Sequence, residues 1–307
     1  MKNKISIYSI LLFGFLSALS AQDFQTLNYL KNDSTSLDLD LFVPKTIISN
    51  KIPLVIFVHG GGFSGGDRTA GHTFGKYLAS KGYACATISY TLYMKGRDFG
   101  CNGILSEKIK AIRIATSDLW AATSYLVDNS EKWNIDTTNM YIAGSSAGAE
   151  TVLHAAYWDY KRMNLFANSL SPTFKYAGLI SGAGAIMDLN LITPKNLIPT
   201  MLYHGNADPT VPYATAAHHY CSCDKPGWLM LFGSYSIYNH IVGLNGSVQL
   251  NTFCGGNHRY NDYYMTTEIQ TVLDFVENVK AGKKLQTHNI ISTGTKNKLS
   301  DKYHFCD

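Results

Sequence analysis

The five residues Gly-Ser-Ser-Ala-Gly at 144–148 constrain the fold of this chain more than any other stretch. They fit the pattern G-x-S-x-G and lie between an apolar run at 140–143 and a helix-compatible run at 147–158. A strand, a sharp turn and a helix are what a nucleophile elbow requires, and the two glycines let the backbone tighten without a clash at Cβ. The pattern therefore predicts that the hydroxyl of Ser146 projects from the edge of a sheet.

The same pattern occurs a second time, at 62–66 around Ser64. On its own the pattern is weak evidence, because a chain with this glycine and serine content contains it by chance roughly 0.2 times. The second copy lies in a glycine-rich loop with no helix-forming run directly behind it. The context thus favours Ser146 over Ser64 as the candidate nucleophile.

Strand-like and helix-like runs alternate along the rest of the chain. A segment of alternating hydrophobicity at 37–43 precedes a continuous apolar run at 54–58, which is typical of a strand buried on both faces. Further strands are predicted at 84–89, 139–143, 177–180, 200–203 and 248–253, and helices at 73–81, 105–127 and 266–279. This order predicts an α/β fold with a mostly parallel central sheet, helices on both faces and a ligand site at the carboxyl ends of the strands.

A serine hydroxyl needs a base to remove its proton, and a histidine base needs a carboxylate to fix its tautomer. Asp208 and His258 each follow a predicted strand by a few residues. Taken alone, an aspartate before a proline is usually a turn former, and a histidine in a Gly/Asn loop is usually a surface residue. Their order along the chain and their shared rim favour a triad of Ser146, Asp208 and His258.

A glycine-rich loop, His-Gly-Gly-Gly-Phe at 59–63, follows the buried strand at 54–58. Consecutive glycines let backbone N–H groups approach a substrate oxygen, so we expect those of Gly61, Gly62 and Ala147 to form an oxyanion hole. A loop of this kind also suits phosphate, but its spacing matches neither of the common nucleotide-binding patterns. The sequence predicts no cofactor.

The four motifs together, at 59–63, 144–148, 204–212 and 257–258, resemble those of the α/β-hydrolase superfamily. The likeness covers 37–280 and is strongest to bacterial carboxylesterases with an HGGG loop, including feruloyl-esterase-like and hormone-sensitive-lipase-like members. It implies a serine carboxylic-ester hydrolase acting through an acyl-enzyme on small, short-acyl or aryl esters, with esters linked to plant polysaccharides as one option. Ser146 is then the nucleophile and His258 the base.

Three positions depart from the pattern of many relatives: Ser145 replaces an acidic residue, Ala149 a glycine, and Asn257 a glycine. These departures keep all three triad residues, but they leave the subfamily and its substrate unassigned. A serine exopeptidase of the same fold is an alternative, although such relatives usually carry an additional large domain. A non-catalytic ligand-binding homologue is another.

The spacing of the strands predicts no large cap domain, because fewer than twenty residues separate 177–180 from 200–203. The unusual segment is 213–247, and 91–103 offers a second wall. Aromatic residues in these loops either contact an acyl or aryl group or form a satellite core. They are Tyr93, Phe99, Trp228, Phe232, Tyr235 and Tyr238.

Residues 1–21 have the form of a secretory signal peptide, with two early lysines, an apolar stretch and small residues near 20–21. An uncleaved membrane anchor is the alternative, but the apolar stretch is short for one. We therefore expect a single catalytic domain at 22–307 that is secreted or periplasmic, without stable membrane insertion. The net charge of +4 is spread along the chain and predicts no nucleic-acid partner.

Six cysteines in an exported chain favour disulfides. Cys85 lies in a strand-like run and is expected to be a buried free thiol, while the other five form the candidate bridging set without assigned pairs. A zinc site built from His218, His219, His258 and nearby cysteines is the alternative, but C-x₂-C spacing is absent. No metal is predicted.

Overall fold

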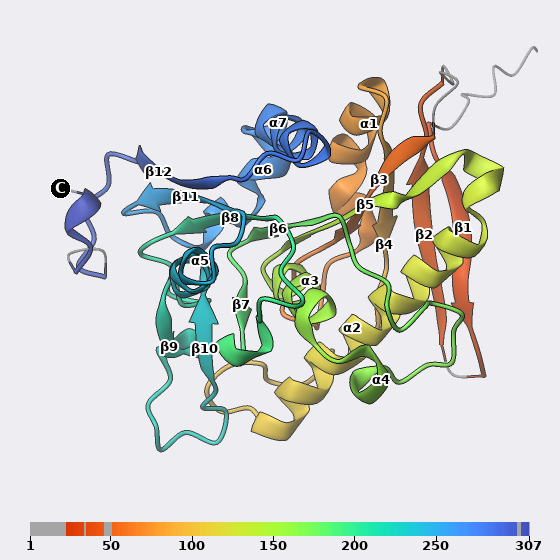
Figure 1. Ribbon diagram of the computed structural model, residues 1–307. Helices are drawn as coiled ribbons and strands as arrows, with labels where there is room; N and C mark the ends of the chain where they lie inside the picture. The colour runs from red at the N-terminus through yellow and green to blue at the C-terminus, as the bar shows by residue number, and fades with distance from the viewer. Residues whose placement is uncertain (1–22, 34, 46–50, 300–301, 307) are drawn as a thin grey trace, which may run out of the picture.

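A nine-stranded sheet forms the centre of the protein (Figure 1). The computed structural model describes residues 23–33, 35–45, 51–299 and 302–306. The strands of the sheet are β1 (Gln25–Lys31), β2 (Ser36–Phe42), β3 (Ile52–Val58), β4 (Ala84–Ile88), β5 (Ile135–Ser145), β6 (Gly178–Gly182), β8 (Thr200–Gly205), β11 (Val248–Cys254) and β12 (Gln286–Ser292). They lie in the order β1-β2-β4-β3-β5-β6-β8-β11-β12; the pairs that involve β2 are antiparallel and the others are parallel.

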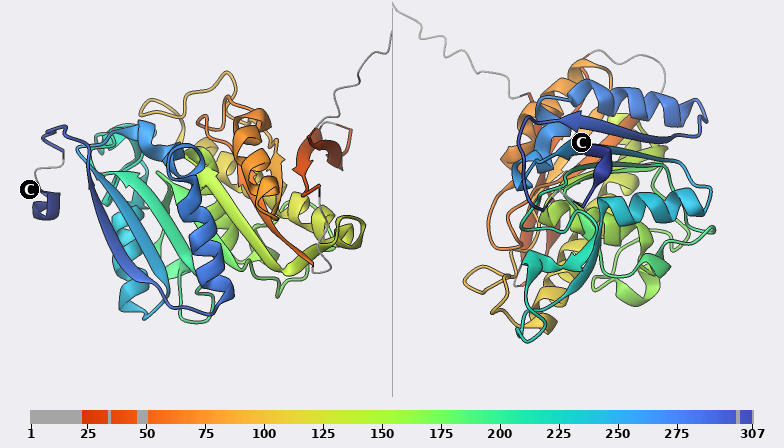
Figure 2. Two further views of the ribbon diagram at one scale, coloured as in Figure 1. Left: turned by 90° about the horizontal axis from the view of Figure 1, so that it is seen from above. Right: turned by 90° about the vertical axis from the view of Figure 1, so that its left-hand side faces the viewer.

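Helices cover both faces of this sheet (Figures 1 and 2). One face carries α1 (His72–Ser80), α6 (Tyr263–Thr266) and α7 (Ile269–Lys280), and the other carries α2 (Leu105–Asp128), α3 (Ala147–Tyr157) and α5 (Ser234–Gly243). Strand β3 contributes to both cores, with Ile56 in the α2 and α3 layer and Phe57 in the α1 and α7 layer. Burial on both sides is why 54–58 is continuously apolar.

The predicted α/β architecture is confirmed, and the main differences lie at the sheet edges. Strands β1 and β12 were not predicted, because each has an exposed face and mixes polar with apolar residues. Edge strands are paired on one side only, so they lack the apolar run that identifies central strands. The helix predicted at 266–279 is divided, with α6 ending at Thr266 and α7 beginning at Ile269.

The segment 213–247 folds as part of the main body. Strands β9 (Thr215–Ala217) and β10 (Met230–Gly233) pair with β7 (Ala185–Ile186) in a small antiparallel sheet of order β7-β10-β9. Phe232, Tyr235 and Tyr238 pack against the main core, which favours the satellite-core interpretation of these aromatics. The remaining short elements are α4 (Tyr160–Met163) and the 3₁₀ helices η1 (Arg68–Gly71), η2 (Ser130–Trp133), η3 (Leu189–Leu191), η4 (His218–Tyr220), η5 (His258–Asp262) and η6 (His304–Cys306).

Two disulfides join segments that are distant in sequence, Cys101–Cys221 and Cys254–Cys306. Cys85 is a buried free thiol, as predicted. Cys223 was counted with the bridging set, but it is free and exposed. The first disulfide connects the two segments proposed as walls, 91–103 and 213–247.

The predicted signal peptide at 1–21 lies outside the described residues. In the part of the chain that the structure describes, no helix combines the length and the apolar character needed to cross a membrane.

The cysteine arrangement predicts the accessibility of each thiol. A chromogenic thiol reagent should titrate one thiol per native chain, Cys223, and two in denaturant without reductant. Burial shields the Cys85 thiol and raises its pKa well above the usual range, so it does not react before unfolding. In a Cys85→Ser variant the count in denaturant should fall to one while the native count stays at one. Four thiols in unreduced, denatured protein would contradict one of the two disulfides, and six would contradict both.

Candidate active site

Ser146 occupies a strained turn between β5 and α3. Its backbone has φ 54° and ψ −121°, a conformation that non-glycine residues rarely adopt. Hydrogen bonds hold it there, with the Ser146 N–H donating to the Gly182 carbonyl at 2.8 Å and the Glu150 N–H donating to the Ser146 carbonyl at 2.9 Å. At Gly148 a Cβ atom would lie 2.1 Å from the carbonyl oxygen of Val58, so only glycine lets α3 pack this closely on β3.

The three residues of the predicted triad are joined by hydrogen bonds. The Ser146 Oγ lies 2.8 Å from His258 Nε2, and His258 Nδ1 lies 2.6 Å from Asp208 Oδ2. Asp208 follows β8, and His258 begins η5 just after β11. A proton on Nδ1, donated to the carboxylate, leaves Nε2 as the acceptor for the serine hydroxyl. The arrangement can therefore deprotonate Ser146 when the hydroxyl attacks.

The carboxylate of Asp208 is buried but well provided with donors. Its Oδ1 accepts the N–H groups of Thr210 at 2.7 Å and Val211 at 3.1 Å. Nε2 of His204 lies 3.3 Å from Oδ2. Burial opposes ionisation, but the hydrogen bonds from His204 and His258 outweigh it and hold the pKa of Asp208 well below its usual value. The role of His204 was missed, although its place four residues before Asp208 was visible.

The three residues expected to stabilise an oxyanion share the cleft of Ser146. Ala147 is the first residue of α3, where backbone N–H groups have no partner within the helix. Among the hydrogen bonds of the described residues, none is donated by the N–H groups of Gly61, Gly62 or Ala147. These three donors are free to bind an oxygen that carries negative charge.

The loop at 59–63 is held by its own first residue. His59 Nδ1 lies 2.7 Å from the Gly60 carbonyl, and the His59 ring stacks on Tyr90 at 4.4 Å between centroids. The hydroxyl of Tyr90 donates to the His59 carbonyl at 3.1 Å. Ser64, the alternative nucleophile, donates its hydroxyl to the Gly61 carbonyl at 3.1 Å and belongs to the same turn. Ser64 therefore lines the cleft beside the loop, without a histidine partner.

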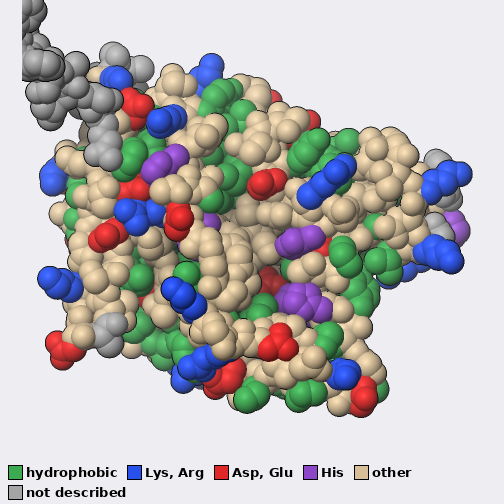
Figure 3. All heavy atoms as spheres, turned by 180° about the vertical axis from the view of Figure 1, so that it is seen from behind, with side chains coloured by type: hydrophobic (Ala, Val, Ile, Leu, Met, Phe, Trp, Pro, Cys, Tyr) green, Lys and Arg blue, Asp and Glu red, His purple; other side chains and the backbone are tan. Residues whose placement is uncertain are grey.

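The cleft has a volume of about 440 Å³. Figure 3 shows one face of the molecule with histidine side chains gathered around a hollow. The side chain of His258 is 26% exposed, so solvent reaches the triad. The lining residues come from six segments of the chain: Gly60, Gly61, Gly62, Ser64, Phe99, Ser146, Ala147, Glu150, Thr210, Val211, His218, His219, His258 and Asn261.

Phe99 and His218 form one wall of this cleft. Their rings meet edge to face with 5.2 Å between centroids, and the Cys101–Cys221 disulfide links the two segments beside them. His219 has a positive φ of 55°, and its N–H donates to the Thr210 carbonyl at 2.8 Å. Of the aromatic residues proposed for the walls, Phe99 lines the cleft, whereas those of 213–247 do not.

Three buried ionisable side chains near the cleft were not predicted from the sequence. Glu150 and His218 line it, with 3.4 Å between Glu150 Oε1 and His218 Nε2. Burial raises the pKa of Glu150 to about 8, partly offset by Lys108, and burial lowers the pKa of His218 well below its usual value. The Lys108 amine donates to the Gly227 carbonyl at 2.8 Å. Glu150 lies one helical turn after Ser146, a position that the elbow pattern does not specify.

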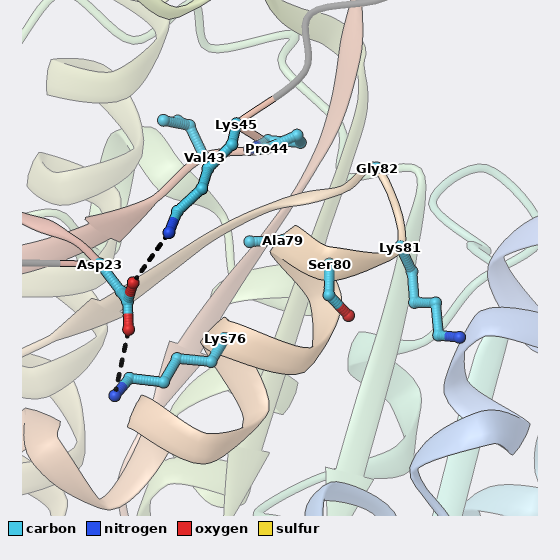
Figure 4. A pocket seen from close by; sticks show the side chains of 9 residues that line it. All are labelled: Asp23, Val43, Pro44, Lys45, Lys76, Ala79, Ser80, Lys81 and Gly82. Carbon is cyan, nitrogen blue, oxygen red and sulfur yellow. Dashed lines mark ion pairs between the residues drawn. The ribbon is translucent and has the colours of Figure 1, made fainter.

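A larger cavity, with a volume of about 600 Å³, lies elsewhere (Figure 4). It is lined by residues next to the ends of β2 and α1, and Asp23 forms ion pairs there with Lys45 and Lys76. It shares no residue with the Ser146 cleft and has neither a histidine nor a cysteine in its lining. The chemistry therefore points to the smaller cleft. Within the described residues, no group of three His, Cys, Asp or Glu side chains is placed to hold a metal ion.

Comparison with known proteins assigns the family. Residues 39–194, just over half of the chain, match the BD-FAE family. The chain belongs to this family. The BD-FAE match includes the glycine loop and Ser146 and ends before Asp208 and His258, so the assignment of these two residues rests on the sequence motifs and the geometry and not on the family match.

Esterases are among the relatives of this BD-FAE chain. It is 27% identical to juvenile hormone esterase of Tribolium castaneum over 186 residues, which is 61% of this chain and 27% of that protein. It is 29% identical to fumonisin B1 esterase of Sphingopyxis macrogoltabida over 119 residues, which is 38% of this chain and 22% of that protein. The matches thus span about a quarter of the length of these relatives.

The fold is that of solved esterase structures. A thermophilic esterase of Thermogutta terrifontis superposes with a TM-score of 0.62 at 14% identity, over 85% of this chain and 94% of that one. The same enzyme phosphorylated by paraoxon gives a TM-score of 0.63 at 14% identity, over 85% and 95%. At this identity the likeness is one of fold, and it agrees with the predicted α/β-hydrolase architecture.

Gly61 offers a test of the loop, because its φ is +119° and a Cβ there would lie 2.2 Å from the Gly65 carbonyl oxygen. Gly61→Ala should lower the melting temperature by several degrees, since it adds a clash to about 1–2 kcal/mol of backbone strain. Gly65→Ala is the matched control, because nothing lies within 4 Å of its Cβ position. Equal melting temperatures for the two variants, measured by calorimetry, would contradict this loop geometry.

Asp118 predicts a pH dependence of stability. It is buried in α2, its Oδ2 accepts the Thr91 N–H at 2.7 Å where the 91–103 segment begins, and burial raises its pKa from 3.8 to about 7 despite that bond. Because the unfolded carboxyl ionises first, the free energy of unfolding falls as the pH rises between these two values. Asp118→Asn should therefore gain roughly 2–3 kcal/mol relative to wild type between pH 5 and pH 8, measured by urea unfolding. An equal difference at both pH values would refute this assignment.

Proposed function

We propose that this protein is a serine carboxylic-ester hydrolase that works through an acyl-enzyme. The observation that carries the proposal is the hydrogen-bonded chain from Ser146 through His258 to Asp208 at the edge of a cleft. The unbonded N–H groups of the glycine loop and of Ala147 support it, as do the esterases among the relatives.

In the first half of the reaction, Ser146 Oγ attacks the ester carbonyl while His258 Nε2 accepts its proton. The carbonyl oxygen becomes an oxyanion, which the N–H groups of Gly61, Gly62 and Ala147 stabilise. Asp208 stabilises the imidazolium that forms on His258. When the tetrahedral intermediate collapses, the alcohol leaves with the proton from Nε2, and the acyl group stays on Ser146.

In the second half, a water molecule takes the place of the alcohol. His258 removes a proton from it as it attacks the acyl carbon, and the same oxyanion donors stabilise the second intermediate. Collapse of that intermediate releases the carboxylic acid and returns the proton to Ser146. His258 acts as the base and then as the acid in each half of the reaction. The proton passes each time through its Nε2 atom, which lies 2.8 Å from Ser146 Oγ.

The cleft suits a small ester. Its volume of about 440 Å³ is in the range of pockets that hold small molecules, which supports short-acyl or aryl esters, including esters attached to a polymer chain. The disulfides and the sequence of residues 1–21 support a protein that is secreted or periplasmic.

A serine exopeptidase of the same fold is the second candidate. The same residues could hydrolyse an amide, because the hydrolysis of amides and of esters proceeds through similar intermediates. A non-catalytic binding protein is the third. Labelling by a fluorophosphonate separates the third from the first two, since it requires a serine that is activated for attack.

Turnover of short-chain nitrophenyl esters tests the proposal directly. Wild-type protein should release nitrophenol, and Ser146→Ala should lose at least about 10⁴-fold in kcat/KM because the nucleophile is gone. Ser64→Ala is the matched control, from the same cleft and the same five-residue pattern, and its loss should stay within a few fold. Fluorophosphonate labelling should follow the same order.

Full activity of the Ser146→Ala variant would refute the assignment of the nucleophile. Cleavage of aminoacyl nitroanilides at rates far above those of the esters would favour the exopeptidase instead.

A further inference from the structure

The cleft of Ser146 contains a second polar pair that ester hydrolysis does not use. Glu150 and His218 both line the cleft, and neither belongs to the triad or to the oxyanion donors. Glu150 is 1% exposed and His218 is 2% exposed. The two side chains approach each other at 3.4 Å, from α3 and from η4.

Both side chains have hydrogen-bonding atoms without a partner. Among the residues that the structure describes, none gives a hydrogen bond to either carboxyl oxygen of Glu150 or pairs with Nδ1 of His218. The amine of Lys108, whose charge acts on Glu150, donates to the carbonyls of Gly227 and Gly100 instead, at 2.8 and 3.5 Å. Leaving a buried polar group unpaired costs free energy, so a ligand that supplies hydrogen-bond partners gains binding energy here.

The surroundings identify the chemistry of that ligand group. A substrate anion would find no amine free to bind it, because the Lys108 amine donates to the carbonyls of Gly227 and Gly100. A substrate cation would be repelled by the buried Lys108, which interacts with Glu150 electrostatically. A neutral hydroxyl fits both partners, because it donates to a carboxyl oxygen and accepts from an imidazole N–H. The apolar ring of Phe99 meets the His218 ring edge to face and holds it in place on this wall.

We propose that Glu150 and His218 form a subsite that binds a hydroxyl group of the ester substrate, on either its acyl part or its alcohol part. This inference rests on the proposed ester hydrolysis and narrows its substrate class to hydroxylated esters. Glu150 and His218 then determine specificity, while Ser146 and His258 carry out the reaction.

Two matched pairs of esters test the subsite and distinguish the two positions of the hydroxyl. The acyl pair is 4-nitrophenyl butyrate and 4-nitrophenyl 3-hydroxybutyrate. The alcohol pair is propyl butyrate and 2,3-dihydroxypropyl butyrate, with acid release measured by titration at constant pH. In wild-type protein, kcat/KM should favour the hydroxylated ester by at least about tenfold in one of the pairs, as expected where a site's buried polar groups need a partner.

Variants show whether the pair is responsible. Glu150→Leu removes both carboxyl oxygens, and His218→Phe keeps a ring against Phe99. In each variant the ratio of kcat/KM for the hydroxylated ester to that for the plain ester should fall to within about twofold of 1. Thr116→Val is the matched control, because the Thr116 hydroxyl is also buried and unpaired but lies outside the cleft. It should keep the wild-type ratio. If Glu150→Leu does not fold, the kcat/KM ratios of the wild-type protein and of His218→Phe still test the subsite.

A wild-type ratio near one in both pairs, with plain esters hydrolysed, would overturn the subsite and leave the proposed function standing. A preference that persists in both variants would overturn it as well. No turnover of any ester, together with no fluorophosphonate labelling, would overturn the proposed function and the subsite with it.

Discussion

The parallel register of the central strands is the constraint on which the whole site depends. Val58 of β3 lies opposite Gly144 of β5, which lies opposite Ser181 of β6, and the same alignment continues across the sheet to β11. The strands therefore end at the same edge of the sheet, although β8 and β11 extend beyond β3, and the loops that leave them meet along one rim. The glycine loop, the Ser146 turn, Asp208 and His258 are brought together by this register although up to two hundred residues separate them in sequence.

The site also shows how hydrogen bonding decides the charge of a buried carboxyl group. Asp208 and Glu150 are both fully enclosed and line or adjoin one cleft. Asp208 accepts bonds from two histidines and two backbone N–H groups, so its pKa falls, whereas Glu150 accepts none and its pKa rises to about 8. One carboxyl group is thereby fixed as an anion beside the base, and the other is available as a neutral partner near pH 7.

Sequence reasoning was accurate where one residue pattern has one structural outcome. The elbow around Ser146 and the buried strand at 54–58 are of this kind, because strained turns need glycine and strands covered on both faces need continuous apolar residues. It failed where the cause is spatial. Neither the pairing of Cys101 with Cys221 nor the contact of Glu150 with His218 has a signature along the chain, since each joins segments that only the folded sheet brings together.

The walls of the cleft are positioned in a different way from the triad. The triad residues lie at strand ends whose positions the central sheet fixes, whereas Phe99 and His218 lie in connecting segments outside that sheet, with His218 at the start of η4. Those loops gain definition from the Cys101–Cys221 disulfide and from the positive-φ turn at His219, which is bonded to Thr210. A rigid wall with buried polar groups discriminates between substrates, because a substrate that cannot form hydrogen bonds with these groups leaves them unpaired. The wall therefore selects the substrate by the cost of leaving Glu150 and His218 without a partner.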